Sequence, residues 1–191
     1  NLSGANLSGA NLSGANLKDS KLYGTDFRGT YLKSADLSRA NLNGANFDGA
    51  YMIQVILEDT KLEGARFNGV HMEGQKLIGR DLSGVSFQNA ILQHVDFKNA
   101  NLTNANLDLA YLNSANLQNA DLTNASMINT DFGGADLTNV NLENAIIHNS
   151  YFKNTKLDGV KTGGTVSDSC FKQDLLNRII CKINFELNPD S

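Results

Sequence analysis

A leucine, phenylalanine, methionine or isoleucine stands at every fifth position from Leu2 to Leu157, thirty-two times without a change of register. A spacing of five suits neither standard element. On an α-helix it advances by about 140°, so the apolar side chains would spiral around the axis. Along a continuous strand, an odd spacing sends successive side chains to opposite faces. The pattern therefore predicts a chain that turns a corner every five residues and points one large apolar side chain inward from each short side.

The residues around each apolar centre suit such corners. Two positions before the centre the residue is usually small, most often alanine, and two positions after it stands mostly glycine or asparagine, as at Gly4 and Asn104. A type II turn needs a positive φ at its third residue, which Gly and Asn adopt at the lowest cost. We expect the small residue to fill the space beside the bulky centre in a narrow core.

A second period, of twenty residues, sets the number of sides in a coil. Phenylalanines recur at this interval at positions 27, 47, 67 and 87. Equivalent residues twenty apart imply four five-residue sides per coil, and so about eight coils. Each coil buries its apolar side chains only by stacking on its neighbours, as in every solenoid.

Segments 100–104 (Ala-Asn-Leu-Thr-Asn) and 120–124 (Ala-Asp-Leu-Thr-Asn) share the pattern A(N/D)LXX. In this pattern the chain resembles the pentapeptide-repeat proteins over about residues 1 to 160. The resemblance implies an all-β fold, a right-handed quadrilateral parallel β-helix. It implies little about function, because members of the family differ widely. Their frequency in bacteria favours a bacterial origin.

The repeat ends near Gly164, so we expect a β-helix over 1–164 and a separate segment over 165–191. Apolar residues in the second segment recur at helical spacing and predict an amphipathic α-helix over roughly 169–184. This helix would cap the last coil, or form a homodimer contact as well. The residues concerned are Phe171, Leu175, Leu176, Ile179, Ile180 and Ile183.

Two further features bear on the context of the chain. It begins in mid-repeat, which predicts either a self-association surface at that end or a piece of a longer polypeptide. Cys170 and Cys181 are too far apart on the expected helix to form a disulfide, so we expect free thiols in a reducing compartment. We therefore expect a cytoplasmic protein, or one secreted into a host cell if the chain is part of an effector.

We find no group of residues that suits catalysis, a cofactor or a metal. His71, His94 and His148 have no third ligand nearby that we can place, and we interpret them as solvated polar residues. No serine pairs with a placeable histidine and carboxylate. The net charge of −4 argues against direct nucleic-acid binding. No apolar run approaches membrane-spanning length, so we expect no membrane contact. We expect a non-catalytic protein.

The best candidate site is a file of outward-pointing residues on one side of the coils. Two interpretations are compatible: the aromatic rings stabilise the sheet by stacking, or the file binds a protein partner, since tyrosine is favoured in binding hot spots. Four of the five tyrosines fall in this file. Its candidate protein-binding residues are Tyr31, Tyr51, His71, Ile91, Tyr111 and Tyr151.

Gln75 and Arg80 stand where the repeat calls for a small residue. An arginine cannot enter a narrow apolar interior unpaired. Either the corner deforms outward, or Arg80 reaches a carboxylate such as Asp59 or Asp81.

The leading hypothesis is a rigid scaffold or protein-interaction module. The alternative comes from the family resemblance, because quinolone-resistance members are thought to mimic DNA and bind type II topoisomerases such as DNA gyrase. Between Lys98 and Lys153 there is no lysine or arginine, while five carboxylates are present. Those carboxylates are spread over all four sides, which weakens the alternative.

Overall fold

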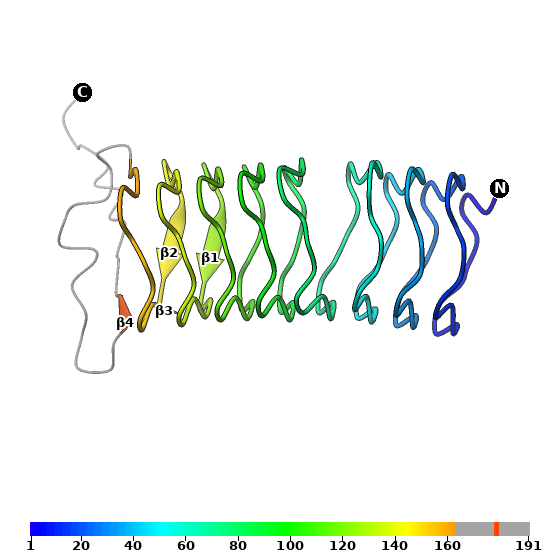
Figure 1. Cartoon of the computed structure of the whole chain (residues 1–191), viewed down its shortest axis with the longest axis horizontal. Coiled ribbons are helices and arrows are strands. Elements are labelled where there is room, and N and C mark those ends of the chain that lie inside the picture. The colour runs from blue at the N-terminus through cyan, green and yellow to red at the C-terminus, as the bar shows by residue number, and fades with distance from the viewer. Residues whose placement is uncertain (163–177, 180–191) are drawn as a thin grey trace, which may run out of the picture.

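The computed structural model describes residues 1–162 and 178–179. Residues 1–162 wind into a rod of stacked four-sided coils (Figure 1). Parallel β-bridges join residues twenty apart in successive coils, from Asn6 with Asp26 to Asn141 with Lys161. The predicted circuit of four five-residue sides is therefore confirmed. The sides are named below by their centres in one coil: the Met52, Leu57, Leu62 and Phe67 sides.

Most sides contribute a single bridged residue, so few extended strands form. Strand β1 (Ser126–Ile128) pairs in parallel with β2 (Ile146–His148), with Ser126 opposite Ile146. Strand β3 (Ser150–Tyr151) pairs antiparallel with β4 (Arg178–Ile179). The first pair follows the winding of the rod, and the second brings in a segment from beyond the repeats.

The pairing of β4 corrects part of the predicted C-terminal helix. Arg178 and Ile179 are extended and lie opposite Tyr151 and Ser150. Strand β3 belongs to the last described coil, and an unpaired strand edge there favours an extended partner that supplies main-chain hydrogen bonds. A continuous helix over 169–184 is thus wrong at these two residues. The rest of that prediction lies outside the described residues, with the proposed cap or dimer residues Phe171, Leu175, Leu176, Ile180 and Ile183 and with Cys170 and Cys181.

The corners have the predicted turn. At the first corner, the N–H of Ala5 donates to the carbonyl of Leu2 at 2.9 Å. The third turn residue has a positive φ throughout, 69° at Gly4 and 58° at Asn104. The side chain before the centre also supports the corner, since the Oδ1 atom of Asp121 accepts the N–H of Thr123 at 3.0 Å. This local bond explains the preference for Asn or Asp at that position.

The core is a continuous column of the apolar centres. On the Phe67 side, the rings of Phe27, Phe47, Phe67 and Phe87 stack with centroids 4.7, 5.1 and 5.4 Å apart. The small residues before the centres are buried beside them, Ala45 and Ala50 completely. The predicted division of labour between large and small inward residues is confirmed.

Candidate interaction surface

The predicted file of outward-pointing residues exists on the Met52 side. Bridges join Tyr31, Tyr51, His71, Ile91 and Tyr111 in turn, and continue through Asp131 to Tyr151. The rings of Tyr31 and Tyr51 are stacked with centroids 4.8 Å apart and planes inclined by 4°. The imidazole of His71 follows at 4.5 Å. We call this file the tyrosine column.

The column is accessible to solvent. Tyr31, Tyr51 and Tyr111 are 49%, 37% and 51% exposed, and His71, Ile91 and Tyr151 are half-buried. Each stacked aromatic pair contributes about 0.5–1.5 kcal/mol beyond its burial. Stacking therefore stabilises the column and also holds its rings rigid, which lowers the entropy that a partner would have to overcome on binding.

A hollow adjoins the C-terminal end of the tyrosine column. Asp131 interrupts the aromatic file between Tyr111 and Tyr151, and its Oδ1 atom accepts the N–H of Gly133 at 2.9 Å. The hollow has a volume of about 520 Å³ and is bordered by Leu109, Asn129, Thr130, Asp131, Asn149 and Tyr151.

Leu109 is a surface residue that our sequence reasoning missed. It lies at the corner between the Phe67 and Met52 sides, is 43% exposed and has a φ of 61°. The left-handed region disfavours a bulky side chain. Asparagine tolerates this region, and Asn89 and Asn129 stand at the equivalent positions of the preceding and following coils. The departure from Gly or Asn was readable in the sequence. Within the described part of the chain, Leu109 is the one aliphatic side chain at positive φ.

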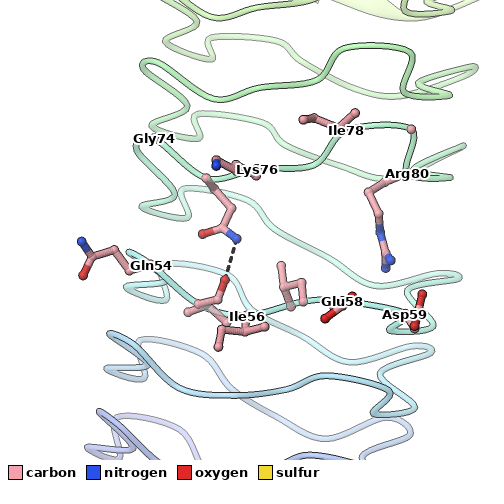
Figure 2. A pocket seen from close by; sticks show the side chains of 12 residues that line it. Gln54, Ile56, Glu58, Asp59, Gly74, Lys76, Ile78 and Arg80 are labelled. Carbon is pink, nitrogen blue, oxygen red and sulfur yellow. Dashed lines mark hydrogen bonds between the residues drawn. The ribbon is translucent and has the colours of Figure 1, made fainter.

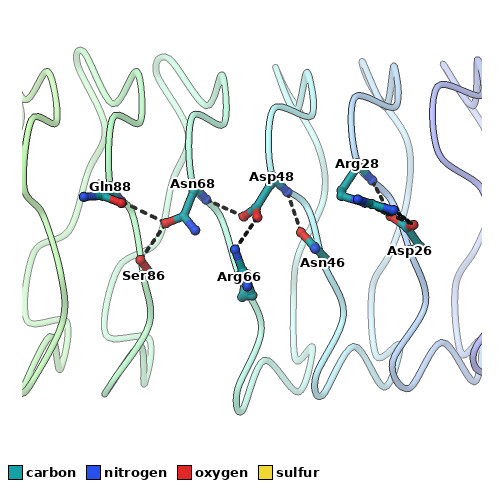
Figure 3. Close-up of polar contacts among 8 residues, drawn as sticks. All are labelled: Asp26, Arg28, Asn46, Asp48, Arg66, Asn68, Ser86 and Gln88. Carbon is teal, nitrogen blue, oxygen red and sulfur yellow. Dashed lines mark hydrogen bonds and ion pairs between the residues drawn. The ribbon is translucent and has the colours of Figure 1, made fainter.

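Polar contacts join successive coils on the outside of the Phe67 side (Figure 3). Asp48 forms an ion pair with Arg66 at 2.7 Å and accepts the N–H of Asn68 at 2.9 Å. The Oδ1 atom of Asn68 in turn accepts the N–H of Gln88 at 3.2 Å. On this side, successive coils are thus held together by polar contacts on the outside and by stacked phenylalanines in the core.

Gln75 and Arg80 disturb two adjacent sides, the Leu57 side and the Leu62 side. The Nε2 atom of Gln75 donates to the carbonyl of Val55 at 2.6 Å. The Nη2 atom of Arg80 donates to both the carbonyl and the hydroxyl oxygen of Thr60, each at 2.6 Å. Figure 2 shows Arg80 extending from its own coil toward the coil of Asp59.

These contacts settle the two sequence-based alternatives for Arg80. The expected carboxylate partner is wrong, because Arg80 bonds to Thr60, and no ion pair with Asp59 or Asp81 forms. The wall instead deforms at this level, and a cavity of about 700 Å³ opens between residues 54–59 and 74–80. A narrow core leaves no inward space for either side chain, so each reaches along the rod axis to the preceding coil.

Within residues 1–162 no three histidine, cysteine or acidic side chains come together as metal ligands. His71 instead faces Glu73, with 3.7 Å between Nδ1 and Oε1. No helix long and apolar enough to cross a bilayer occurs in the described part of the chain.

The sequence profile "Pentapeptide repeats" matches this chain in eight copies, over residues 1–33, 30–69, 81–119, 105–144 and 120–161. The chain belongs to the pentapeptide-repeat family. Pentapeptide-repeat proteins form right-handed quadrilateral β-helices, the fold expected from the resemblance. The matches leave out residues 70–80, the segment that contains Gln75 and Arg80.

Several solved pentapeptide-repeat structures are similar to this chain. The HetL protein of Nostoc sp. strain PCC 7120, involved in heterocyst differentiation regulation, is 27% identical over 82% of this chain and 70% of its own, with a TM-score of 0.47. QnrB1, a plasmid-mediated fluoroquinolone resistance protein, is 19% identical over 81% and 90%, with a TM-score of 0.45. Because both scores are below 0.5, membership rests on the sequence match. No curated protein sequence matches this pentapeptide-repeat chain.

Proposed function

We propose that this pentapeptide-repeat chain is a non-catalytic rigid scaffold that binds a protein partner through the tyrosine column. The stacked rings of Tyr31, Tyr51 and His71, of which the two tyrosines are exposed, are the observation that carries the proposal. Aromatic side chains on a rigid backbone bury a large area on binding and lose little conformational freedom.

The C-terminal end of the tyrosine column supports the same proposal. Leu109 holds an exposed aliphatic side chain in an unfavourable backbone conformation beside the hollow that Tyr151 borders. Backbone strain concentrates at binding sites, where the surrounding structure maintains it. The aromatic stack from Tyr31 to His71 and the hollow beside Tyr151 would thus form one extended contact surface along the Met52 side.

Partner capture tests the proposal. A variant with Tyr31, Tyr51 and Tyr111 changed to Ser should lose a partner that the unaltered chain retains. Tyr23 offers a matched control, since it is 62% exposed but lies outside the column. The Tyr23→Ser variant should retain the partner. Equal capture by the triple variant and the unaltered chain would rule the column out.

The DNA-mimic alternative has weaker support. A mimic of DNA needs a dense, ordered array of free negative charge, whereas several carboxylates here face a basic group. Asp19 pairs with Arg39 at 2.7 Å, Asp26 with Arg28 at 2.6 Å, Asp48 with Arg66 at 2.7 Å and Asp136 with Lys156 at 3.1 Å. A gyrase supercoiling assay at micromolar protein should show no inhibition.

A further inference from the structure

The wall of the rod is interrupted on the Leu57 side. In regular coils, the N–H of a centre donates to the carbonyl nineteen residues ahead, as Leu37 does to Ile56 at 2.9 Å. The corresponding bonds from Leu57 to Lys76 and from Asp59 to Ile78 are absent, and no other described residue replaces them. The bridge between Ile56 and Lys76 is absent as well. Two donors on one edge therefore face two acceptors on the other across an open wall.

The interruption covers the Leu57 and Leu62 sides and the corners that flank them, where the bonds from Gln54 to Glu73 and from Ser86 to Ala65 are absent. On the Leu62 side the bonds from Leu62 to Asp81 and from Gly64 to Ser83 are also absent. Beyond these sides the coils are closed again, since Met52 donates to His71 at 2.7 Å and Phe67 to Ser86 at 2.9 Å. The stacked rings on the Met52 side and the polar contacts on the Phe67 side hold the closed half together. The opening is thus built into the rod.

Buried polar atoms without partners border this opening. Gln75 is 6% exposed, and while its Nε2 atom is bonded to Val55, its Oε1 atom has no partner. The Nε atom of Arg80 is likewise buried and unpaired. A buried polar atom left unpaired costs about 1–3 kcal/mol. The Gln75 oxygen therefore marks the place of a missing donor, in the cavity that Gln75 itself borders.

Two exposed isoleucines flank the same cavity. Ile56 is 47% and Ile78 is 49% exposed, and both border the opening (Figure 2). Each is the one apolar residue in its column of equivalent positions. The residues equivalent to Ile56 are Asn16, Asp36, Lys76, Asp96, Asn116, Asp136 and Lys156, and those equivalent to Ile78 are Lys18, Ser38, Glu58, Lys98, Gln118, Thr138 and Asp158. Apolar surface thus appears on these columns only where the wall is open.

We propose that the opening binds an extended peptide segment of a partner protein, which adds as a strand between the two coils. A peptide main chain carries donors and acceptors along both of its edges, so it would meet the free N–H groups of Leu57 and Asp59 on one side and the free carbonyls of Lys76 and Ile78 on the other. A third main-chain N–H would satisfy the Gln75 oxygen. Apolar side chains of the peptide would cover Ile56 and Ile78.

The chemistry of the lining favours a peptide over an ion. Glu58, Asp59, Lys76 and Arg80 contribute two charges of each sign, so a small anion or cation would meet as much repulsion as attraction. A small ion would also satisfy one edge and leave the other unpaired. The site is separate from the tyrosine column, which lies on a closed side.

A displayed library of random-sequence peptides tests this proposal on the full chain. Selection should yield peptides that bind the unaltered chain at least about tenfold more tightly than a Gln75→Ala, Arg80→Ala variant, in which the wall can close. Binding should slow hydrogen exchange at the amides of Leu57 and Asp59. No peptide with this preference, or binding that leaves both amides unprotected, would overturn the proposal.

A second variant keeps the test decisive if the closed variant misfolds. Ile56→Asn with Ile78→Gln uses residues found in the same two columns and should weaken a selected peptide at least about tenfold. The matched control is Ile146→Asn, at an isoleucine that is 51% exposed but far from the opening; it should bind normally. Equal binding by the paired variant and this control counts against the proposal. The tyrosine-column variant should bind the peptide unchanged, which separates this proposal from the previous one.

Discussion

The Nη2 atom of Arg80 lies 2.6 Å from the carbonyl oxygen of Thr60. In a regular coil that oxygen would accept the N–H of Asp81, as the carbonyl of Ala40 accepts the N–H of Lys61 at 3.1 Å. The guanidinium group has replaced a backbone donor, and the amide of Gln75 does the same at Val55. Two long side chains thus stand between coils that would otherwise bond directly.

Replacing both side chains by alanine should therefore stabilise the rod. Gln75→Ala with Arg80→Ala removes the two polar groups and lets the missing backbone bonds form, each contributing about 0.5–1.5 kcal/mol net. We expect a gain of about 2 kcal/mol and a Tm higher by about 5 °C. Thermal unfolding measures it. The reverse change one coil later, Val95→Gln with Ala100→Arg, should lower the Tm, and a stable variant there would contradict the explanation.

Truncating a stacked phenylalanine should destabilise the rod strongly. Phe47 is fully buried between Phe27 and Phe67, so Phe47→Ala leaves a cavity that neighbouring coils cannot fill. The expected loss is about 3–5 kcal/mol, or a Tm lower by about 10 °C. Urea unfolding followed by circular dichroism measures it. Leu7→Ala, at a partly buried centre near the end of the rod, should cost less.

Replacing Leu109 should raise stability while weakening partner binding. Its φ of 61° suits asparagine, and the left-handed region costs a bulky residue about 1–2 kcal/mol. Leu109→Asn should therefore raise the Tm by about 3 °C. Asn104→Ala is the opposite control: φ there is 58°, and the Tm should fall. A lower Tm for Leu109→Asn would mean that packing of the leucine outweighs its backbone strain.

Asp136 should make stability depend on pH. Partial burial by itself raises the pKa of its carboxyl group, but hydrogen bonds from Thr138, Gln118 and Lys156 outweigh this and hold the pKa well below its usual value. A lowered folded-state pKa means that the stabilisation is complete above the unfolded-state pKa of about 3.9 and is lost as the pH falls below it.

Asp136→Asn tests this dependence. The variant should be about 1–3 kcal/mol less stable than the unaltered chain at pH 7, and the difference should shrink between pH 4 and pH 2. Urea unfolding at the three pH values measures it. The control is Asp158→Asn, at an exposed residue, which should change stability little at any pH. A difference for Asp136→Asn that persists unchanged at pH 2 would show that its charge is not responsible.

The repeat was predictable because each of its positions has a local role. A centre such as Leu102 must point inward, Ala100 must leave room beside it, and Asn104 must accept a positive φ. These demands act within five residues, so they leave a pattern that can be read without coordinates. The twenty-residue period also predicts which residues stack between coils, and the predicted neighbours Tyr31 and Tyr51 are indeed stacked.

The sequence shows which positions break the repeat, but it does not show what structure forms at them. Gln75 and Arg80 clearly break the rule for small residues, and Leu109 breaks the rule for Gly or Asn. Whether Arg80 would find a carboxylate or a backbone oxygen depends on the distance between coils, which no local pattern specifies. Ile56 and Ile78 could be interpreted as part of a binding site only after the structure showed that the wall between their coils is open.

The sequence by itself determined the square circuit, the inward column of apolar centres and the file of tyrosines, because periodic side-chain chemistry dictates periodic backbone geometry. Only the tertiary structure decided where that geometry fails. The opening beside Gln75 and Arg80 and the strand pairing of Arg178–Ile179 with Ser150–Tyr151 both arise from hydrogen bonds between segments far apart along the chain. Such bonds depend on which donors and acceptors remain free after the coils have stacked.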